Sequence, residues 1–388
     1  MDTVKGPYLM LVTHSSMVDF MVMTVAVHPY RANNVMTLEG FNTYTEPLMR
    51  SLGVLGTRKY ISDLNLIKNI RYCIDKLENP FVLFPEARYS LDGCTSYIPE
   101  STAKLIRLLR VPVIVLRIHG NFITQPQWNK IDKGNHIEAE MEQIITAKEC
   151  KKLTVAEIDA RVKEAFQYDD FKWQYENKIH IDHPKRAEGL HALLYKCPAC
   201  QTEGEMHSKG IKLWCEHCGK EWEMDEYGRM HALIGDTEFH HIPDWSNWER
   251  ECVRKEIEEG TYYFEDTARI ETLPGSLKFY YQGEGKVIQT PTETRIECNY
   301  HGEPYVLTRS SMDLESMHIE YDYLGRGDCI DVSIPNDSFW CYLTKRDVIT
   351  KISFATEEMH LLAVRKAAEE KAAAEKAKEA LKETEKSE

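Results

Sequence analysis

The stretch YLMLVTHSSMVD at residues 8–19 decides the fold of this chain, together with a second stretch of the same kind, FVLFPEAR at residues 81–88. Each begins with a continuous apolar run and ends in polar, ionisable residues. Continuous apolar runs, rather than alternating ones, are typical of strands covered on both faces, as in a parallel sheet. Because functional groups gather at the carboxyl ends of such strands, we expect a His, an Asp, a Glu and an Arg to converge on one crevice.

The same pattern continues through the first third of the chain. Further apolar runs predict strands at residues 35–38, 54–56 and 113–118, and helical patterns lie between them at residues 64–77 and 101–109. Alternation of strands and helices is the signature of an α/β protein. We therefore expect an α/β domain at residues 1–135, with a mostly parallel sheet flanked by helices.

The remaining regions differ in composition and predict further parts. Residues 136–190 are charged and helical in pattern, and they contain a capping box at residues 154–157. Residues 255–355 are rich in Tyr, Phe, Thr, Ile and Val with glycine punctuation, which is typical of a small antiparallel β-rich domain; we expect a barrel or a sandwich. Residues 356–388 end almost wholly in Ala, Glu and Lys, which predicts a charged C-terminal helix without an apolar stripe to bury.

Composition limits the functions that the chain can have. The formal net charge of -14 over 388 residues argues against nucleic acid as a partner, because phosphate neutralisation needs clustered Lys and Arg. No apolar stretch approaches the ~20 residues that cross a bilayer, and the pattern of a secretory signal is missing. The odd number of cysteines, 11, argues against a disulfide scaffold. We expect a cytoplasmic protein.

Four of these cysteines form a regular pattern within residues 191–228. Cys197 and Cys200 make one Cys-x2-Cys pair, and Cys215 and Cys218 make a second one fourteen residues later. Two such pairs at this separation predict a zinc ribbon, in which four thiolates fill a tetrahedral ion and leave no open position. We therefore expect a structural zinc. A redox dithiol pair and unused buried cysteines are the competing interpretations.

His14 and Asp19 are the first candidates for chemistry. If His14 lies in the turn after the strand and Asp19 in the first turn of the next helix, the carboxylate can reach back to one imidazole N–H. The other ring nitrogen then becomes a base for an incoming hydroxyl. The alternative is purely structural, because Ser16 and Asp19 also match a capping box. A second His-x4-Asp, at His231 and Asp236, shows how common the bare pattern is.

Two further segments bring charge to the same edge of the predicted sheet. Glu86 and Arg88 follow the strand at residues 81–84, and such residues are rarely buried unless they are paired or used. Arg58 ends the glycine-containing turn at residues 53–58 and could bind a phosphate in a bidentate way. The alternatives are an ion pair that closes a loop and an ordinary surface turn.

In this order and spacing, the segments resemble the glycerolipid acyltransferases, most closely the lysophosphatidate (1-acylglycerol-3-phosphate) acyltransferase group. The His-x4-Asp block, the turn that ends in Arg58, Phe84-Pro85-Glu86 and the Val-Pro-Val strand at residues 111–113 match the four blocks of that family. Ala87 stands where the family usually has Gly, and Arg88 comes one position early. Most members also carry membrane-embedding helices before the first block, and no such helices precede His14 here.

The resemblance implies a function and a role for each residue. His14 would deprotonate the acceptor hydroxyl, and Asp19 would orient His14. Arg58, Glu86 and Arg88 would bind the glycerol phosphate. The donor would be an acyl thioester on coenzyme A or acyl carrier protein, and the acceptor would be lysophosphatidate or a related lysophospholipid.

The same resemblance, with no bilayer-spanning segment in view, leads us to expect a peripheral enzyme at the inner membrane face. Three alternatives stay open: a different lysolipid acceptor, a non-catalytic lipid-binding or scaffold protein with the same fold, and a zinc-ribbon module for nucleic acid. The net charge opposes the last of these.

Overall fold

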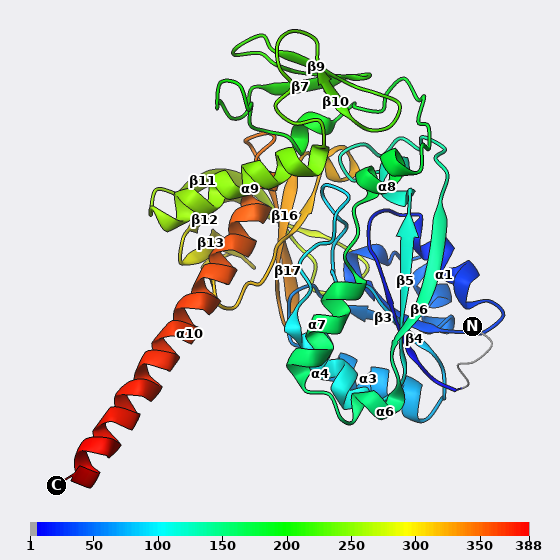
Figure 1. Cartoon of the computed structure of the whole chain (residues 1–388), viewed down its shortest axis with the longest axis vertical. Coiled ribbons are helices and arrows are strands. Elements are labelled where there is room, and N and C mark those ends of the chain that lie inside the picture. The colour runs from blue at the N-terminus through cyan, green and yellow to red at the C-terminus, as the bar shows by residue number, and fades with distance from the viewer. Residues whose placement is uncertain (1–5, 388) are drawn as a thin grey trace.

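The structure, a computed structural model, describes the backbone of residues 6–387 and the side chains of residues 6–377. It contains three β-sheets and a long C-terminal helix that extends away from the rest of the molecule (Figure 1).

The first sheet has six strands in the order β3-β2-β4-β1-β5-β6. The strands are β1 (Leu9–Val12), β2 (Asn33–Thr37), β3 (Val54–Thr57), β4 (Phe81–Leu83), β5 (Val113–His119) and β6 (Glu138–Ile145). The first five pair in parallel, and β6 pairs with β5 in the antiparallel direction. The sequence-based expectation of a mostly parallel sheet is confirmed, and each of the five predicted strands lies within two residues of its predicted bounds.

Helices cover both faces of this sheet. They are α1 (Asp19–Val27), α2 (Glu46–Ser51), α3 (Leu64–Asp75), α4 (Glu100–Leu109), α5 (Asn121–Thr124), α6 (Ala147–Cys150), α7 (Val155–Ala165) and α8 (Asp170–Glu176). Successive side chains of β1 point to opposite faces. Leu9 and Leu11 pack in the core under α3, α4 and α7, whereas Met10 and Val12 pack in the core under α1. Burial on both faces explains why the strands have continuous apolar sequences.

The expectation of a purely helical segment at residues 136–190 is wrong at its beginning, where β6 forms. Its Glu-rich sequence lowers strand propensity, so the pattern alone indicates a helix. The free edge of β5 decides the outcome, because Arg117 on β5 binds Glu140 and Glu142 on β6 at 2.7 Å each. The rest of the segment is helical, and the capping box from Thr154 to Glu157 at the start of α7 is confirmed.

The second sheet carries the four-cysteine pattern and has the strand order β10-β9-β8-β7. Its strands are β7 (Met206–Lys209), β8 (Lys212–Cys215), β9 (Glu221–Met224) and β10 (Met230–Ala232). It forms the upper part of the molecule in Figure 1. The sheet extends past residue 228, the end that we predicted for the ribbon.

The third sheet is antiparallel and has seven strands in the order β14-β13-β12-β11-β17-β16-β15. They are β11 (Phe264–Thr272), β12 (Tyr280–Thr290), β13 (Glu293–Tyr300), β14 (Glu303–Ser310), β15 (His318–Glu320), β16 (Cys329–Ile334) and β17 (Asp337–Leu343). A β-rich region is confirmed, but not as a barrel or sandwich. Within the described residues the strands form a single sheet whose outer strands, β14 and β15, pair on one side only. The helix pair α9 and α10, rather than a second sheet, completes its core.

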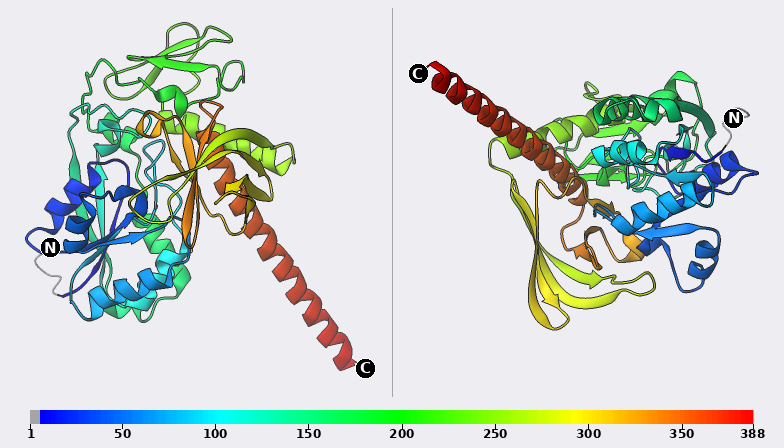
Figure 2. Two further views of the ribbon diagram at one scale, coloured as in Figure 1. Left: turned by 180° about the vertical axis from the view of Figure 1, so that it is seen from behind. Right: turned by 90° about the horizontal axis from the view of Figure 1, so that it is seen from below.

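These two helices pack against each other beside the third sheet. The helix α9 (Ile242–Glu258) contacts the first part of α10 (Ile349–Ser387) through Val253, Ile257, Ala355 and Met359. Figure 2 shows that α10 then continues well beyond the sheet. Side chains from residue 361 to 377 are largely exposed, as their charged sequence predicts. Among the described residues, no helix combines the length and apolarity needed to span a bilayer.

Candidate active site

His14 and Glu86 lie at the carboxyl ends of neighbouring strands. Because β1 and β4 pair in parallel, the loops that follow them emerge side by side. The backbone N–H of His14 donates to Glu86 Oε2 at 2.7 Å, and the His14 carbonyl accepts from the Ser90 N–H at 2.8 Å. The two segments singled out in the sequence therefore form one site.

Asp19 holds the imidazole of His14. The Nδ1 atom of His14 is 3.0 Å from Asp19 Oδ2, which also accepts the backbone N–H groups of Ser15 at 2.6 Å and Ser16 at 3.0 Å. The side-chain amide of Asn121 donates to the other carboxylate oxygen. Asp19 is completely buried, and such a carboxylate is stable only when donors surround it. These contacts fix its position.

The second imidazole nitrogen of His14 is free. When Nδ1–H donates to Asp19, Nε2 carries the lone pair, and Nε2 has no hydrogen-bond partner among the described residues. The ring lies between Phe84 and Tyr89, with centroids 4.4 and 4.2 Å away, and its side chain is 20% exposed. The geometry leaves one oriented base that a substrate can reach.

Glu86 ties the loops together instead of facing the solvent. Its two oxygens accept the backbone N–H of His14 and, at 2.6 Å, the N–H of Ser96. Burial raises its pKa to about 7, in spite of these two donors. The adjacent Ala87 has a φ of 55°, in the left-handed region that Gly adopts without strain. This is the position where the resembled family has Gly.

Neither serine after His14 is arranged as a nucleophile. The Ser15 hydroxyl is hydrogen-bonded to the Tyr168 hydroxyl, and the Ser16 hydroxyl accepts the Val18 N–H at 3.3 Å. Only half of the alternative capping box forms: Asp19 Oδ2 accepts the Ser16 N–H at 3.0 Å, whereas the Ser16 hydroxyl accepts the N–H of Val18 and not that of Asp19.

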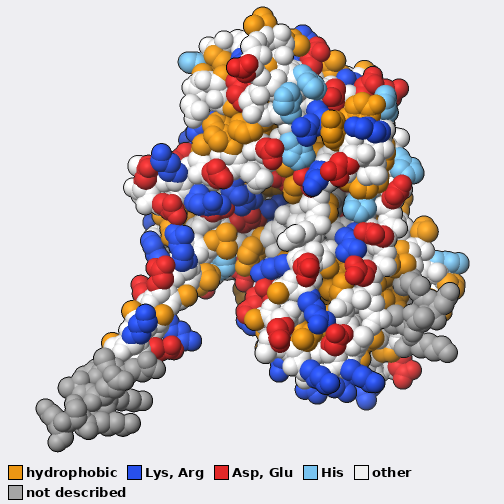
Figure 3. Space-filling view, viewed as in Figure 1, with side chains coloured by type: hydrophobic (Ala, Val, Ile, Leu, Met, Phe, Trp, Pro, Cys, Tyr) orange, Lys and Arg blue, Asp and Glu red, His pale blue; other side chains and the backbone are white. Residues whose placement is uncertain are grey.

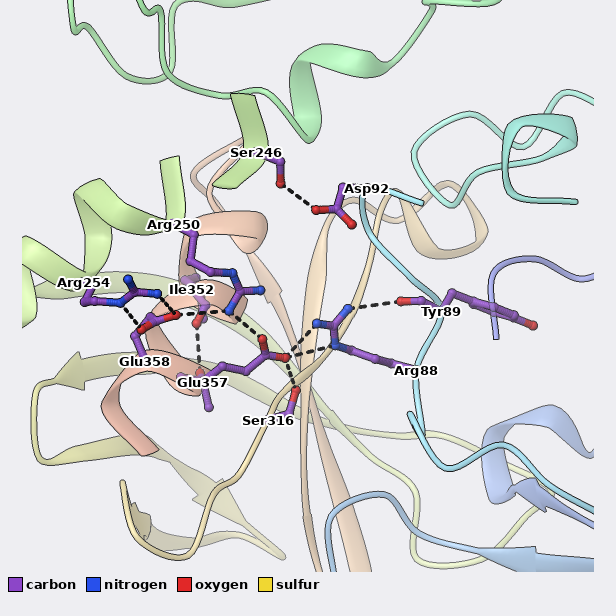
Figure 4. A network of polar contacts seen from close by, with 11 residues as sticks. Arg88, Tyr89, Asp92, Ser246, Arg250, Arg254, Ser316, Ile352, Glu357 and Glu358 are labelled. Atoms are coloured by element: carbon purple, nitrogen blue, oxygen red, sulfur yellow. Dashed lines mark hydrogen bonds and ion pairs between the residues drawn. The ribbon is translucent and has the colours of Figure 1, made fainter. Parts of the chain in front are cut away.

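Arg88 is brought to a different place. It is 4% exposed, and its guanidinium binds Glu357 of α10 at 2.7 Å. Glu357 also accepts from Arg250 of α9 at 2.8 Å and from Ser316 at 2.7 Å. Figure 4 shows this network between the loop after β4 and the two helices. Because the Arg88 guanidinium is engaged by Glu357, it does not form an open phosphate site here. Its role in headgroup binding stays a prediction.

Arg58 also contacts the protein itself. Its guanidinium donates to the backbone carbonyls of Pro274 at 2.7 Å and Asn336 at 2.9 Å, both in loops of the third sheet. Of the five residues predicted for catalysis and headgroup binding, the structure brings together His14, Asp19 and Glu86. Arg58 instead contacts loops of the third sheet, and Arg88 binds α10.

Sequence reasoning missed Asn121 and Tyr168. Asn121 follows β5 directly after Gly120, so the rule that predicted the other site residues could have found it. Tyr168 comes from the segment between α7 and α8, and nothing in its local sequence indicates a contact with Ser15.

The second His-x4-Asp pattern serves as an internal comparison. His231 pairs with Asp225 at 2.8 Å instead of Asp236, and its side chain is 50% exposed on the ribbon. The His14 pair differs because its carboxylate is buried and fixed by further donors.

An apolar groove lies beside α1, the helix that begins at Asp19. Between α1 and β6 a space of about 450 Å³ is lined by Met21, Val22, Val25, Ala26, Leu116, Ile137, Glu138, Ala139 and Met141. The outer face of α1 is also apolar, with Val25 76% and Met21 60% exposed. On the face seen in Figure 3, by contrast, acidic and basic side chains are interspersed, and the surface is hollowed between α10 and the α/β part.

The four cysteines of the ribbon converge as a metal site requires. The Sγ atoms of Cys197 and Cys218 are 3.7 Å apart, as are those of Cys200 and Cys215. A tetrahedral zinc with Zn–S bonds of about 2.3 Å places its sulfurs about 3.8 Å apart. The two turns are alike: the N–H of Gln201 bonds the Cys197 carbonyl at 2.9 Å, and that of Gly219 bonds the Cys215 carbonyl at 2.8 Å. The four residues therefore fit a zinc ion.

The sequence matches no protein-family model and no curated protein. Among solved structures, the 1-acyl-sn-glycerophosphate (LPA) acyltransferase PlsC from Thermotoga maritima is similar, with a TM-score of 0.34 and 16% sequence identity. The similarity covers 42% of this chain and 66% of that chain, slightly less than two thirds of its length. A likeness of this size does not decide the activity of this chain.

Proposed function

We propose that this chain is an O-acyltransferase that moves a fatty acyl group from an acyl thioester to the hydroxyl of lysophosphatidate or a related lysophospholipid. One observation carries the proposal: the Nδ1 atom of His14 is held 3.0 Å from a buried, fully hydrogen-bonded Asp19, while Nε2 is free. The order of the sequence blocks supports the lipid acceptor.

His14 would act as the general base. Its Nε2 takes the proton of the acceptor hydroxyl as the hydroxyl oxygen attacks the thioester carbonyl. A C–O bond forms, and the carbonyl π electrons move to oxygen. When the tetrahedral species collapses, the C–S bond breaks, and the thiolate takes the proton from the imidazolium. Asp19 stabilises the imidazolium and keeps the tautomer.

This mechanism needs no covalent enzyme intermediate. Ser15, the nearest hydroxyl in sequence, is engaged by Tyr168 rather than by His14. Direct transfer depends on positioning the two substrates. We propose that the apolar groove between α1 and β6 receives the acyl chains, since it starts at the helix that carries Asp19.

The acceptor headgroup is the next part of the proposal. Arg58 and Arg88 both bind protein groups, an arrangement that also fits two alternatives: a different lysolipid acceptor, or a lipid-binding protein without turnover. Headgroup binding by Arg58, Glu86 and Arg88 would require the two arginines to exchange these contacts for the substrate.

Two further elements complete the proposal. We propose that Cys197, Cys200, Cys215 and Cys218 hold a structural zinc, because their spacing and convergence leave no open coordination position. We also propose that the protein binds a membrane surface peripherally through the exposed apolar face of α1.

The proposal is tested by release of free thiol from acyl-coenzyme A or acyl-acyl carrier protein with the purified full chain. Lysophosphatidate is compared with a monoacylglycerol, which offers the hydroxyl without the phosphate. We expect thiol release that depends on the acceptor. If neither donor releases thiol with either acceptor, while the protein still binds lipid vesicles, the lipid-binding alternative replaces the enzyme.

A further inference from the structure

A second cluster of ionisable groups lies where the α/β sheet meets the third sheet. Glu39 follows β2 in the short 3-10 helix Leu38–Gly40, whereas His318 and Asp331 belong to β15 and β16. His318 and Asp331 face each other directly in the register of the two strands. One ligand atom from each of the three residues lies within 4.8 Å of the others.

His318 is arranged as a metal ligand. Its side chain is 2% exposed, its Nε2 is 3.3 Å from Glu320 Oε1, and its Nδ1 points toward Asp331 Oδ2 at 3.7 Å. That distance is too long for a hydrogen bond, and Nδ1 has no partner among the described residues. In a metal-ligating imidazole, the ring nitrogen that does not bind the metal usually faces a carboxylate or a carbonyl, and Glu320 lies on that side of His318.

Carboxylates outnumber lysines around the cluster. Three carboxylates, those of Glu39, Glu320 and Asp331, lie around His318. Lys59 lies 3.5 Å from Glu39 Oε1 and compensates one of them. The ammonium of Lys130, 3.8 Å from Glu320, lies on a side chain that is 53% exposed and is screened by water.

We propose that Glu39, His318 and Asp331 bind a divalent cation that links the carboxyl edge of the α/β sheet to the third sheet. A divalent ion would add positive charge among these carboxylates, and the unpartnered Nδ1 of His318 would gain a partner. Three protein ligands leave coordination positions open for water or an anionic oxygen. The site does not depend on the proposed acyl transfer, because none of its residues contacts His14.

The ligand types select the ion. One imidazole and two carboxylates suit Mn²⁺ or Zn²⁺, whereas the thiolates of the ribbon select zinc and disfavour Mn²⁺. Mn²⁺ is therefore the probe that reports on this cluster alone, without exchange at the cysteines.

The test is titration of the full chain, with its ribbon zinc in place, by Mn²⁺, followed through the electron paramagnetic resonance signal of the free ion and through total metal content. We expect one Mn²⁺ per chain. Glu39→Gln and Asp331→Asn should abolish binding, and Glu320→Gln should weaken it about 10- to 100-fold, as losses of outer partners do.

Glu46→Gln is the matched control, because Glu46 also joins the α/β part to the third sheet, through Ser276 at 2.9 Å. It should leave Mn²⁺ binding unchanged. Glu39 is 14% exposed and lies in a short surface turn, so its variant keeps the test valid if Asp331→Asn does not fold. Failure of the wild type to bind either Mn²⁺ or a second equivalent of Zn²⁺ would overturn the proposal. Binding that survives Glu39→Gln and Glu320→Gln would overturn it equally.

Discussion

The carboxylate of Glu86 accepts backbone N–H groups from His14 and Ser96, and it does so at a fully buried position. The loop that carries His14 is therefore held by a residue that need not touch a substrate. In the resembled family the same position is expected to bind the acceptor headgroup. The contacts seen here support a positioning role.

The raised pKa of Glu86 gives stability a defined pH dependence. Its pKa is 4.5 in a free side chain and about 7 in the fold. Below about pH 4.5 Glu86 is protonated in both the folded and the unfolded state, and its full contribution to the free energy of unfolding is present. As pH rises from 4.5 through 7, only the folded state keeps the proton, so the free energy of unfolding decreases, by roughly 3 kcal/mol in all.

Urea unfolding of wild type and Glu86→Gln between pH 5.5 and 7.5 measures this contribution. The free energy of unfolding of the variant should decrease less steeply with pH. The difference in slope should correspond to at most one bound proton. Asp170, whose pKa burial also raises to about 7, contributes equally to both proteins and cancels in the comparison. Equal slopes would contradict the account.

Single residues also show what sequence could predict. His14, Asp19 and Glu86 meet because parallel strands end at one edge, which the apolar runs already indicated. The same rule failed for Arg88, because a partner 269 positions away, Glu357, binds it. Long-range pairing of this kind leaves no local signal.

At the scale of elements, α10 is anchored to the loop after β4 by the buried Arg88–Glu357 pair. Removing one partner of a buried ion pair typically costs about 3–5 kcal/mol, because the other charge stays buried. Burial would oppose the charge of Glu357, yet Arg88 and Arg250 lower its pKa to about 2.

We therefore expect Arg88→Met and Glu357→Gln each to lower the free energy of unfolding by about 3 kcal/mol, with strong coupling in the double variant. The control is Arg365→Met, which breaks the exposed Arg365–Glu258 pair between α10 and α9. Its cost should stay below about 1 kcal/mol. Similar costs for Arg88 and Arg365, measured by chemical denaturation, would refute an anchoring role.

The helix α1 carries the proposed membrane contact. Val25→Glu places a charge on its exposed apolar face and should reduce sedimentation with vesicles of phosphatidylcholine and phosphatidylglycerol about tenfold or more, as expected for losing one buried Val side chain. Ile234→Glu is the matched control, since Ile234 is 86% exposed on the ribbon. Equal loss in both variants would show that the effect is not specific to α1.

Elements were predictable where the pattern is strong. The continuous apolar strands and α3 and α4 lie close to their expected bounds. The strand β6 was not predictable, because its acidic sequence pairs only through the edge of β5 and Arg117. Whether the β-rich strands close into a barrel depended on packing against α9 and α10, which local sequence does not report.

At the scale of the whole molecule, the ribbon belongs to the largest hydrophobic core. Trp222 and Met206 of the ribbon share this core with Phe122 and Phe171 of the α/β part and with Phe339 of the third sheet. A metal that orders the ribbon thus supports all three sheets. We predict that the free energy of zinc binding appears as folding stability of the whole chain.

Metal analysis should find one thiolate-bound zinc per chain. Cys200→Ser should remove it and lower the midpoint of thermal unfolding by several degrees in a single transition. Cys252→Ser is the control, because Cys252 lies outside the cluster. Loss of zinc without any change in unfolding would contradict the shared core.

The most direct test of the central claim is acyl transfer to lysophosphatidate by wild type, His14→Ala and Asp19→Asn, with His231→Ala as the matched control. His231 also pairs with an aspartate, but on the surface of the ribbon. We predict that His14→Ala and Asp19→Asn each lower the turnover rate about 10²- to 10⁴-fold, without loss of fold, whereas His231→Ala keeps wild-type turnover. Full activity in His14→Ala would contradict the account, because no other described residue occupies the place of that base.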